Sequence, residues 1–242
     1  MPDHIVSAFD ADLGALRQRI AEMGGIAEKM LADASEALVR DDAELAQAVI
    51  AADPRLDGLQ RDIEERGVLT IARRQPLAVD LREIVSAIRI AGDLERAGDL
   101  SKNMAKRVLA MAGRMHPKRI VGGVRHMSDL ALGQLKDVLD AYAASDVEAA
   151  LSVWRRDGAI DALNNSLFRE LLTYMMEDPR SISFCTHLLF CAKNIERIGD
   201  HTTNIAETVH YLVTGEALSA ERPKDDRSSF ALIEPPAGAA DT

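Results

Sequence analysis

The sequence has few aromatic residues, and this scarcity limits the folds it can adopt. Aromatic residues make up 4% of the 242 residues, whereas Ala, Leu, Arg, Glu and Asp are abundant. A β-sandwich or β-barrel needs many more aromatic and β-branched residues, so the composition excludes an all-β fold. The abundant residue types lose little side-chain freedom in helices and favour an all-α fold.

The chain also lacks an excess of positive charge and any long hydrophobic run. It has 29 Lys+Arg against 39 Asp+Glu, a net charge of −10. This balance argues against nucleic-acid binding and against a polybasic membrane anchor. No apolar run approaches the roughly 18 residues of a membrane span, and acids stand where a signal peptide would be basic and then apolar. We therefore expect no nucleic-acid partner and no direct membrane insertion.

Cysteine is scarce as well, with only Cys185 and Cys191 present. Six residues along a helix correspond to about 9 Å of rise and to different faces, so a disulfide between the two is implausible. We expect both to be small buried side chains in a cytoplasmic protein.

Apolar residues recur every three or four positions between the prolines, which is the helical period. The pattern predicts six helices, at 5–40, 43–74, 78–113, 118–143, 146–177 and 181–214. Short connections between long helices are typical of antiparallel bundles. The segment 216–242 is rich in Pro and Ala without helical period, and we predict a disordered tail there.

An internal repeat divides the helices into two sets. DLERAGDLSKNMA, starting at Asp93, aligns with NIERIGDHTTNIA, starting at Asn194, and six of the thirteen positions are identical. Upstream, DPRLDGL at 53–59 aligns with DGAIDAL at 157–163. The repeat predicts two tandem antiparallel three-helix bundles, at 1–115 and 116–215.

Each half carries two acid pairs spaced four residues apart, on two different helices. Residues at this spacing share one helix face, with Cβ atoms about 5–6 Å apart. If two such stripes face each other, their repulsion requires a cation, and an all-oxygen set suits Mg²⁺, Mn²⁺, Ca²⁺ or Fe. Asn103 and Asn204 extend the stripes by one turn as weaker candidates. The predicted metal ligands are Asp53, Asp57, Glu95 and Asp99, then Asp157, Asp161, Glu196 and Asp200.

A single acid pair on so charged a chain is more often a solvated face or part of a surface ion-pair ladder. Recurrence in both halves favours a metal site instead. Gly98 and Gly199 lie inside these motifs, where glycine costs a helix about 1 kcal/mol relative to alanine. The simplest interpretation is that each allows another backbone to approach closely.

A helix disruptor follows the first acid in each half, Pro54 in one and Gly158 in the other. Proline disfavours helical geometry in the residue before it, and glycine loosens a helix. Pro54 is compatible with a helix that starts there and with a helix that runs on with a kink. Both alternatives remain open on the sequence alone.

Other candidate sites are weaker. Glu207 and His210 have the Glu-x-x-His spacing of di-iron bundles, but the equivalent first-half stretch, 106–109, lacks both ligands. His201 points about 100° away from Asp200 on a helix, so we expect an exposed polar residue rather than a ligand. No phosphate-binding loop or catalytic triad is present, and we predict that the chain is not an enzyme.

The repeated segments DLERAGDLSKNMAKR and NIERIGDHTTNIAETVHYLVTGE resemble the paired signature of the PhoU family of phosphate-uptake regulators. The resemblance covers residues 1 to about 216. It implies two three-helix bundles with carboxylate metal clusters on their surfaces, at the eight acids named above. The cofactors expected are divalent or trivalent metal ions: Mg, Mn, Fe or Zn.

The resemblance further implies a cytoplasmic homodimer that restrains phosphate uptake and the phosphate-starvation response. Its partners would be the ATPase subunit of the phosphate ABC transporter and the sensor histidine kinase of the phosphate regulon. We expect an adaptor whose bound ions hold helices in register. A metal-free helical scaffold and a carboxylate-bridged di-metal oxidase are the alternative functions.

Overall fold

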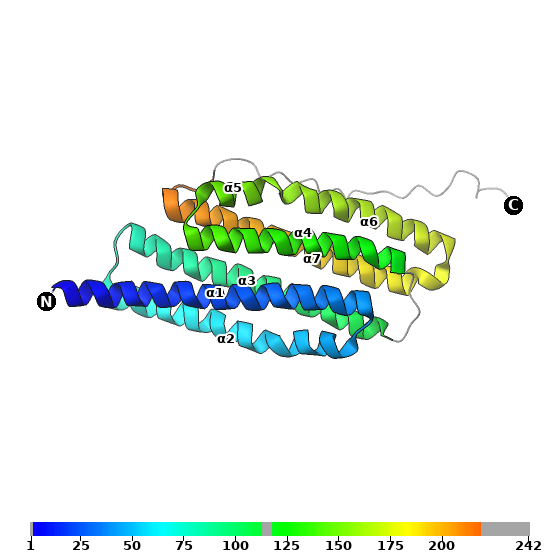
Figure 1. Ribbon diagram of the computed structural model, residues 1–242, viewed down its shortest axis with the longest axis horizontal. Coiled ribbons are helices and arrows are strands. Elements are labelled where there is room, and N and C mark those ends of the chain that lie inside the picture. Colours follow the sequence, from blue (N-terminus) through cyan, green and yellow to red (C-terminus); the bar gives the residue numbers. More distant parts are fainter. Residues whose placement is uncertain (1, 113–117, 219–242) are drawn as a thin grey trace.

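A computed structural model describes residues 2–112 and 118–218 of the chain (Figure 1). Within these ranges the chain forms α-helices and one 3₁₀ turn, and no strand. Most of the predicted tail, from residue 219 on, lies outside the described residues, as does the predicted domain boundary at 115–116. The elements are α1 (Pro2–Arg40), α2 (Ala43–Arg74), α3 (Val79–Met111), α4 (Lys118–Ala144), α5 (Val147–Arg155), α6 (Asp157–Glu177), η1 (Pro179–Ser181) and α7 (Ile182–Thr214).

The helices form two stacked layers, as Figure 1 shows. Helices α1, α2 and α3 pack against one another, and α4 and α7 pack with the consecutive helices α5 and α6. The layers meet where α3 lies against α7 and α1 against α4. Buried apolar residues of both layers form one continuous core, including Ile20, Leu94, Val124 and Ile195. The predicted all-α fold of two repeated bundles is confirmed.

The repeat extends to the starts of the helices. Asp42 caps α2 by accepting a hydrogen bond from the Leu45 N–H at 2.9 Å, and Asp146 caps α5 by accepting one from Ala149 at 3.0 Å. The residues before these caps both have a positive φ, 54° at Asp41 and 53° at Ser145. Caps of this kind satisfy backbone donors that the first helical turn leaves unpaired.

The prediction of a single fifth helix at 146–177 is wrong in one respect, because the structure has two helices there, α5 and α6. The chain leaves α-helical geometry at Arg156, where φ is −92° and ψ is 0°. The Arg156 N–H bonds to the Val153 carbonyl at 3.0 Å, and its own carbonyl accepts a hydrogen bond from Gln134 of α4 at 3.1 Å. Gly158 directly follows the break. The same carbonyl also accepts from the Ala159 N–H at 3.1 Å, so a side chain of another helix adds a second hydrogen bond at the break.

Pro54 behaves differently from its counterpart in the second half. Helix α2 runs from Ala43 through Pro54 to Arg74 without interruption. Of the two alternatives left open by the sequence, the start of a helix at Pro54 is therefore excluded.

In the part of the chain that the structure describes, no helix is long and apolar enough to cross a membrane.

Candidate functional site

The two acid pairs of the first half flank a point of close contact between α2 and α3. A Cβ atom added to Gly98 of α3 would lie 2.1 Å from Cδ2 of Leu56 in α2. Leu56 stands between Asp53 and Asp57 in the sequence, and Gly98 stands between the two acids of α3. The glycine therefore admits a side chain of the neighbouring helix, rather than the backbone that the sequence suggested. Its effect is to bring the carboxylates of α2 and α3 together.

A lysine holds the centre of this first cluster. The Lys102 ammonium lies 2.7 Å from Oδ2 of Asp53 and 2.6 Å from Oδ1 of Asp99. Its side chain is 19% exposed, and that of Asp53 is 12% exposed. Burial alone would lower the pKa of Lys102, but the hydrogen bonds to the two aspartates outweigh burial and raise the pKa to about 12.

Glu95 also belongs to this cluster. Burial raises the pKa of its carboxyl group above the ordinary value, and the negative charges of Asp99, Asp57 and Asp53 add to the rise, while Arg96 opposes it. These four acids are therefore close enough to interact. The prediction that the two stripes of the first half face each other agrees with this arrangement.

The second half repeats the geometry around Gly199. A Cβ atom added there would lie 2.9 Å from Cδ1 of Ile160, which stands between the two acids of α6. Asp157 and Asp161 of α6 and Glu196 of α7 are buried, with exposed fractions of 5% or less. The Thr203 hydroxyl of α7 donates to Oδ1 of Asp157 at 2.9 Å. These acids lie on the two facing helices, as the repeat predicts.

The donor chemistry of both clusters fits a hard cation, because every candidate ligand is an oxygen. In the arrangement that the structure describes for residues 2–112 and 118–218, no group of three or more His, Cys, Asp or Glu side chains is placed to hold a metal ion. Side chains would have to turn toward a common point before an ion could bind. The eight ligands stay a prediction.

Lys102 was not among the site residues predicted from the sequence. Its spacing of three from Asp99 was visible in the motif DLSKNMA, but its contact with Asp53, 49 residues away, depends on the packing of α2 against α3. The two asparagine candidates have different surroundings. Asn103 is exposed, whereas Asn204 donates a hydrogen bond to Oδ1 of Asp93 at 3.2 Å.

His201 is not the exposed polar residue that we expected. Its side chain is 19% exposed, and Nδ1 lies 2.9 Å from Oδ1 of Asp93 on α3. The contact links α7 to α3 across the boundary between the bundles. Helical spacing within α7 gave no sign of this partner, which is 108 residues away.

The Glu-x-x-His pair takes part in other contacts. Glu207 accepts a hydrogen bond from the Trp154 indole N–H at 3.0 Å, and Nδ1 of His210 lies 3.1 Å from the Glu216 carbonyl oxygen. No observation favours the di-metal oxidase. Cys185 and Cys191 are both buried free thiols.

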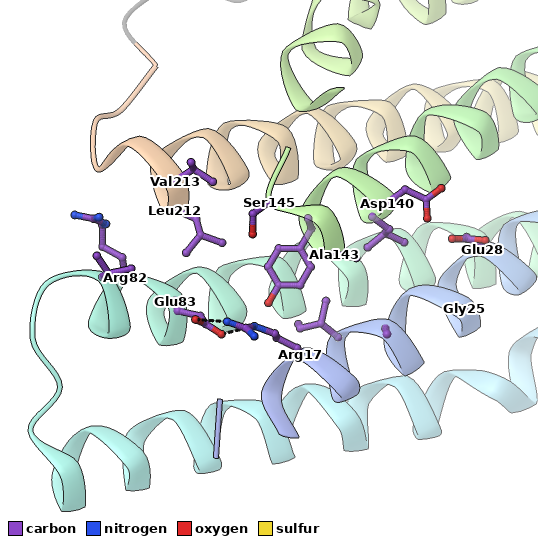
Figure 2. Close-up of a pocket in the computed structure, with 15 residues that line it drawn as sticks. Arg17, Gly25, Glu28, Arg82, Glu83, Asp140, Ala143, Ser145, Leu212 and Val213 are labelled. Carbon is purple, nitrogen blue, oxygen red and sulfur yellow. Dashed lines mark hydrogen bonds and ion pairs between the residues drawn. The ribbon is translucent and has the colours of Figure 1, made fainter. Parts of the chain in front are cut away.

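A cleft of about 670 Å³ lies between the bundles, at the end where the α2–α3 connection and the end of α7 meet (Figure 2). Figure 2 shows Arg17 and Glu83 joined within it, with an Nε to Oε1 distance of 2.6 Å. Arg82 packs against Gly215, where an added Cβ atom would lie 2.7 Å from Nη1 of Arg82. Gly215 has φ of 80° and ends α7, so glycine is required there for both reasons.

Beside this cleft, three apolar side chains project from the α2–α3 connection and the first turn of α3. Leu77 is 81% exposed, Val79 56% and Leu81 38%, and we call these three the apolar crest. Val79 also lines the cleft. Between the first two, Ala78 has φ of 45° and ψ of −104°, a conformation that costs a residue with a Cβ atom free energy. An exposed apolar group held by a strained connection is typical of a binding surface.

A family model described as the PhoU domain matches residues 20–108 and again residues 124–209. The chain belongs to the PhoU family. The two PhoU matches cover the two bundles in turn, and both contain the acid pairs described above.

Relatives of this PhoU chain cover nearly its whole length. The phosphate-specific transport system accessory protein PhoU homolog of Rhizobium meliloti (strain 1021) is 61% identical over 226 residues, which are 93% of this chain and 95% of the relative. The crystal structure of PhoU from Pseudomonas aeruginosa is 41% identical, with a TM-score of 0.83 over 86% of this chain and 100% of that one. The phosphate transport system regulatory protein PhoU from Streptococcus pneumoniae is 30% identical, with a TM-score of 0.80 over 88% of this chain and 100% of that one.

Proposed function

We propose that this chain is a cytoplasmic negative regulator of phosphate uptake and of the phosphate-starvation response, and that it acts by binding partners rather than by catalysis. Its membership of the PhoU family and the names of its relatives support a role as an accessory protein of phosphate transport. The observation in this structure that carries the proposal is the apolar crest, which exposes three large side chains beside a cleft.

The partners in this proposal are the ATPase subunit of the phosphate ABC transporter and the sensor histidine kinase of the phosphate regulon, bound by a homodimer of this chain. A regulator of this kind acts by binding one conformational state of its partner more tightly than another. Because the crest is apolar, an apolar segment of the partner would complement it.

Binding between the purified ATPase subunit and the purified chain tests whether the crest is the binding surface. Leu77→Asp places a charge in the centre of the crest, and we expect it to weaken binding at least about tenfold, which corresponds to about 1.4 kcal/mol. Met176→Asp changes a side chain that is 61% exposed, at the end of α6, and serves as the matched control. Binding that is equally tight for Leu77→Asp and the parent would exclude the crest.

Metal binding forms the second part of the proposal. Asp157, Asp161, Glu196 and Asp200 would hold a divalent or trivalent ion, with Mg, Mn, Fe or Zn as candidates. Burying carboxylates costs free energy unless positive charge or hydrogen-bond donors compensate. Lys193 lies 3.0 Å from Oε2 of Glu196 and Thr203 donates to Asp157, and an ion would add positive charge between α6 and α7. It would act as a structural link that holds the two helices in register.

Removal of the ion gives a direct test of this part. Because a ligand stabilises the folded state that binds it, we expect the chain purified without chelator to lose thermal stability in EDTA and to regain it with excess Mn²⁺. An unchanged melting temperature in EDTA would favour the metal-free scaffold.

A further inference from the structure

The two bundles are built alike, but one residue in their acid clusters differs in charge. In the repeat, Lys102 of α3 corresponds to Thr203 of α7. Each of these side chains bonds to the first acid of the neighbouring helix: Lys102 to Asp53 at 2.7 Å, and Thr203 to Asp157 at 2.9 Å. The position is thus the same in both halves, and an ammonium in one half replaces a hydroxyl in the other.

We infer that Lys102 takes the place of a metal ion in the first bundle, so that the chain as it exists binds no ion with Asp53, Asp57, Glu95 and Asp99. The second half also has a lysine, Lys193, whose ammonium lies 3.0 Å from Oε2 of Glu196 in the same helix, whereas the Lys102 ammonium contacts carboxylates of two helices. This inference refines the metal-binding part of the proposed function, which it limits to one of the two predicted sites.

The position of the ammonium carries the inference. Lys102 lies within hydrogen-bond distance of one carboxylate from α2 and one from α3, so it already joins the two helices that an ion would join. Oxygen atoms engaged by the ammonium would have to turn away from it to coordinate an ion. An ion bound by the same oxygens would also repel the lysine at short range.

The lysine has little room to withdraw. Its side chain is only 19% exposed, and its ammonium is held by hydrogen bonds to Asp53 at 2.7 Å and to Asp99 at 2.6 Å. A substitution that removes the ammonium therefore tests its role. Lys102→Met keeps most of the length of the side chain and removes the ammonium, which leaves four carboxylates with the spacing of the second half.

Equilibrium dialysis of the full chain against Mn²⁺, after treatment with EDTA, tests the inference. Bound manganese is measured by elemental analysis in the parent, in Lys102→Met and in Asp157→Asn/Glu196→Gln. We expect the parent to bind Mn²⁺ only in the second half, the double variant to bind none, and Lys102→Met to bind an additional ion. Lys102→Met added to the double variant should restore binding.

Two control variants distinguish the effect of the Lys102 charge from an effect on folding. Lys102→Arg keeps the positive charge and should bind as the parent does, and Lys106→Met removes an exposed lysine from the next turn of α3 and should change nothing. Circular dichroism establishes that each variant is helical.

The outcomes distinguish this inference from the proposed function. Mn²⁺ that Asp157→Asn/Glu196→Gln retains and then loses when Asp53→Asn/Asp99→Asn is added, or no additional ion in folded Lys102→Met, would overturn the role of Lys102. If the parent binds no Mn²⁺ while Lys102→Met binds it, metal binding by the second half is wrong and the role of Lys102 stands. Should Lys102→Met not fold, the double variant with and without Asp53→Asn/Asp99→Asn still decides, because only an ion held by the first-half acids would be lost when those two acids are changed.

Discussion

Gly98→Ala tests whether close approach of α2 and α3 assembles the first acid cluster. The added Cβ atom would lie 2.1 Å from Cδ2 of Leu56 and 3.6 Å from Sδ of Met30. Carbon atoms in contact normally lie about 3.5–4.0 Å apart. Leu56 is fully buried and Met30 is 2% exposed, so neither side chain can turn into solvent to make room.

The expected free-energy change has two opposing parts. Overpacking of a core costs about 1–3 kcal/mol, whereas alanine in a helix interior gains about 1 kcal/mol over glycine. Gly92→Ala, in the same helix, adds a Cβ atom that would have no neighbour within 4 Å, so it gains helix propensity without the clash. The difference between the two variants isolates the clash, and we expect Gly98→Ala to be the less stable by about 1–3 kcal/mol.

Urea unfolding and thermal unfolding, both followed by circular dichroism, measure this difference. For a chain of this size each kcal/mol corresponds to about 2–4 °C in Tm, so the two variants should be separated by at least about 2 °C. Equal stabilities for Gly98→Ala and Gly92→Ala would refute the claim that Gly98 sets the approach of the two helices.

Further predictions concern the thiols, the first cluster and the boundary between the bundles. Burial raises the pKa of Cys191 to about 12 and also raises that of Cys185, so neither thiol should react with Ellman's reagent at pH 8 until urea unfolds the chain; rapid reaction in the folded chain would contradict their burial. Because the pKa of Glu95 is raised, its charge destabilises the folded state at pH 7 and ceases to do so below its ordinary value of 4.5. We therefore expect Glu95→Gln, in EDTA, to be more stable than the parent at pH 7 and to lose this advantage toward pH 4 in urea titrations, and a less stable variant at pH 7 would count against the cluster. His201→Ala removes the contact with Asp93 and should cost about 1 kcal/mol in the same assay, whereas an unchanged stability would mean that the contact does not help to hold the bundles together.

Local sequence patterns predicted the features that depend on one helix or on the repeat. Apolar spacing located the long helices, and the duplicated motif placed the acid pairs on facing helices in each bundle. The motif also identified Gly98 and Gly199 as points of close approach, although each meets a side chain, Leu56 or Ile160, rather than a backbone.

Features that depend on a distant partner were not visible in the sequence. At the break, the Arg156 carbonyl accepts a hydrogen bond from Gln134 of another helix. His201 is half-buried because α3 brings Asp93 against it. Lys102 was inside the motif, but helical spacing alone could not show that its ammonium also meets a carboxylate of α2.

Anomalous diffraction from crystals of the parent chain soaked in Mn²⁺ tests the account most directly. We predict a manganese peak beside Glu196 and Asp161 of the second bundle, and the Lys102 ammonium still between Asp53 and Asp99 in the first. A manganese peak between Asp53 and Asp99, with the lysine displaced into solvent, would contradict it.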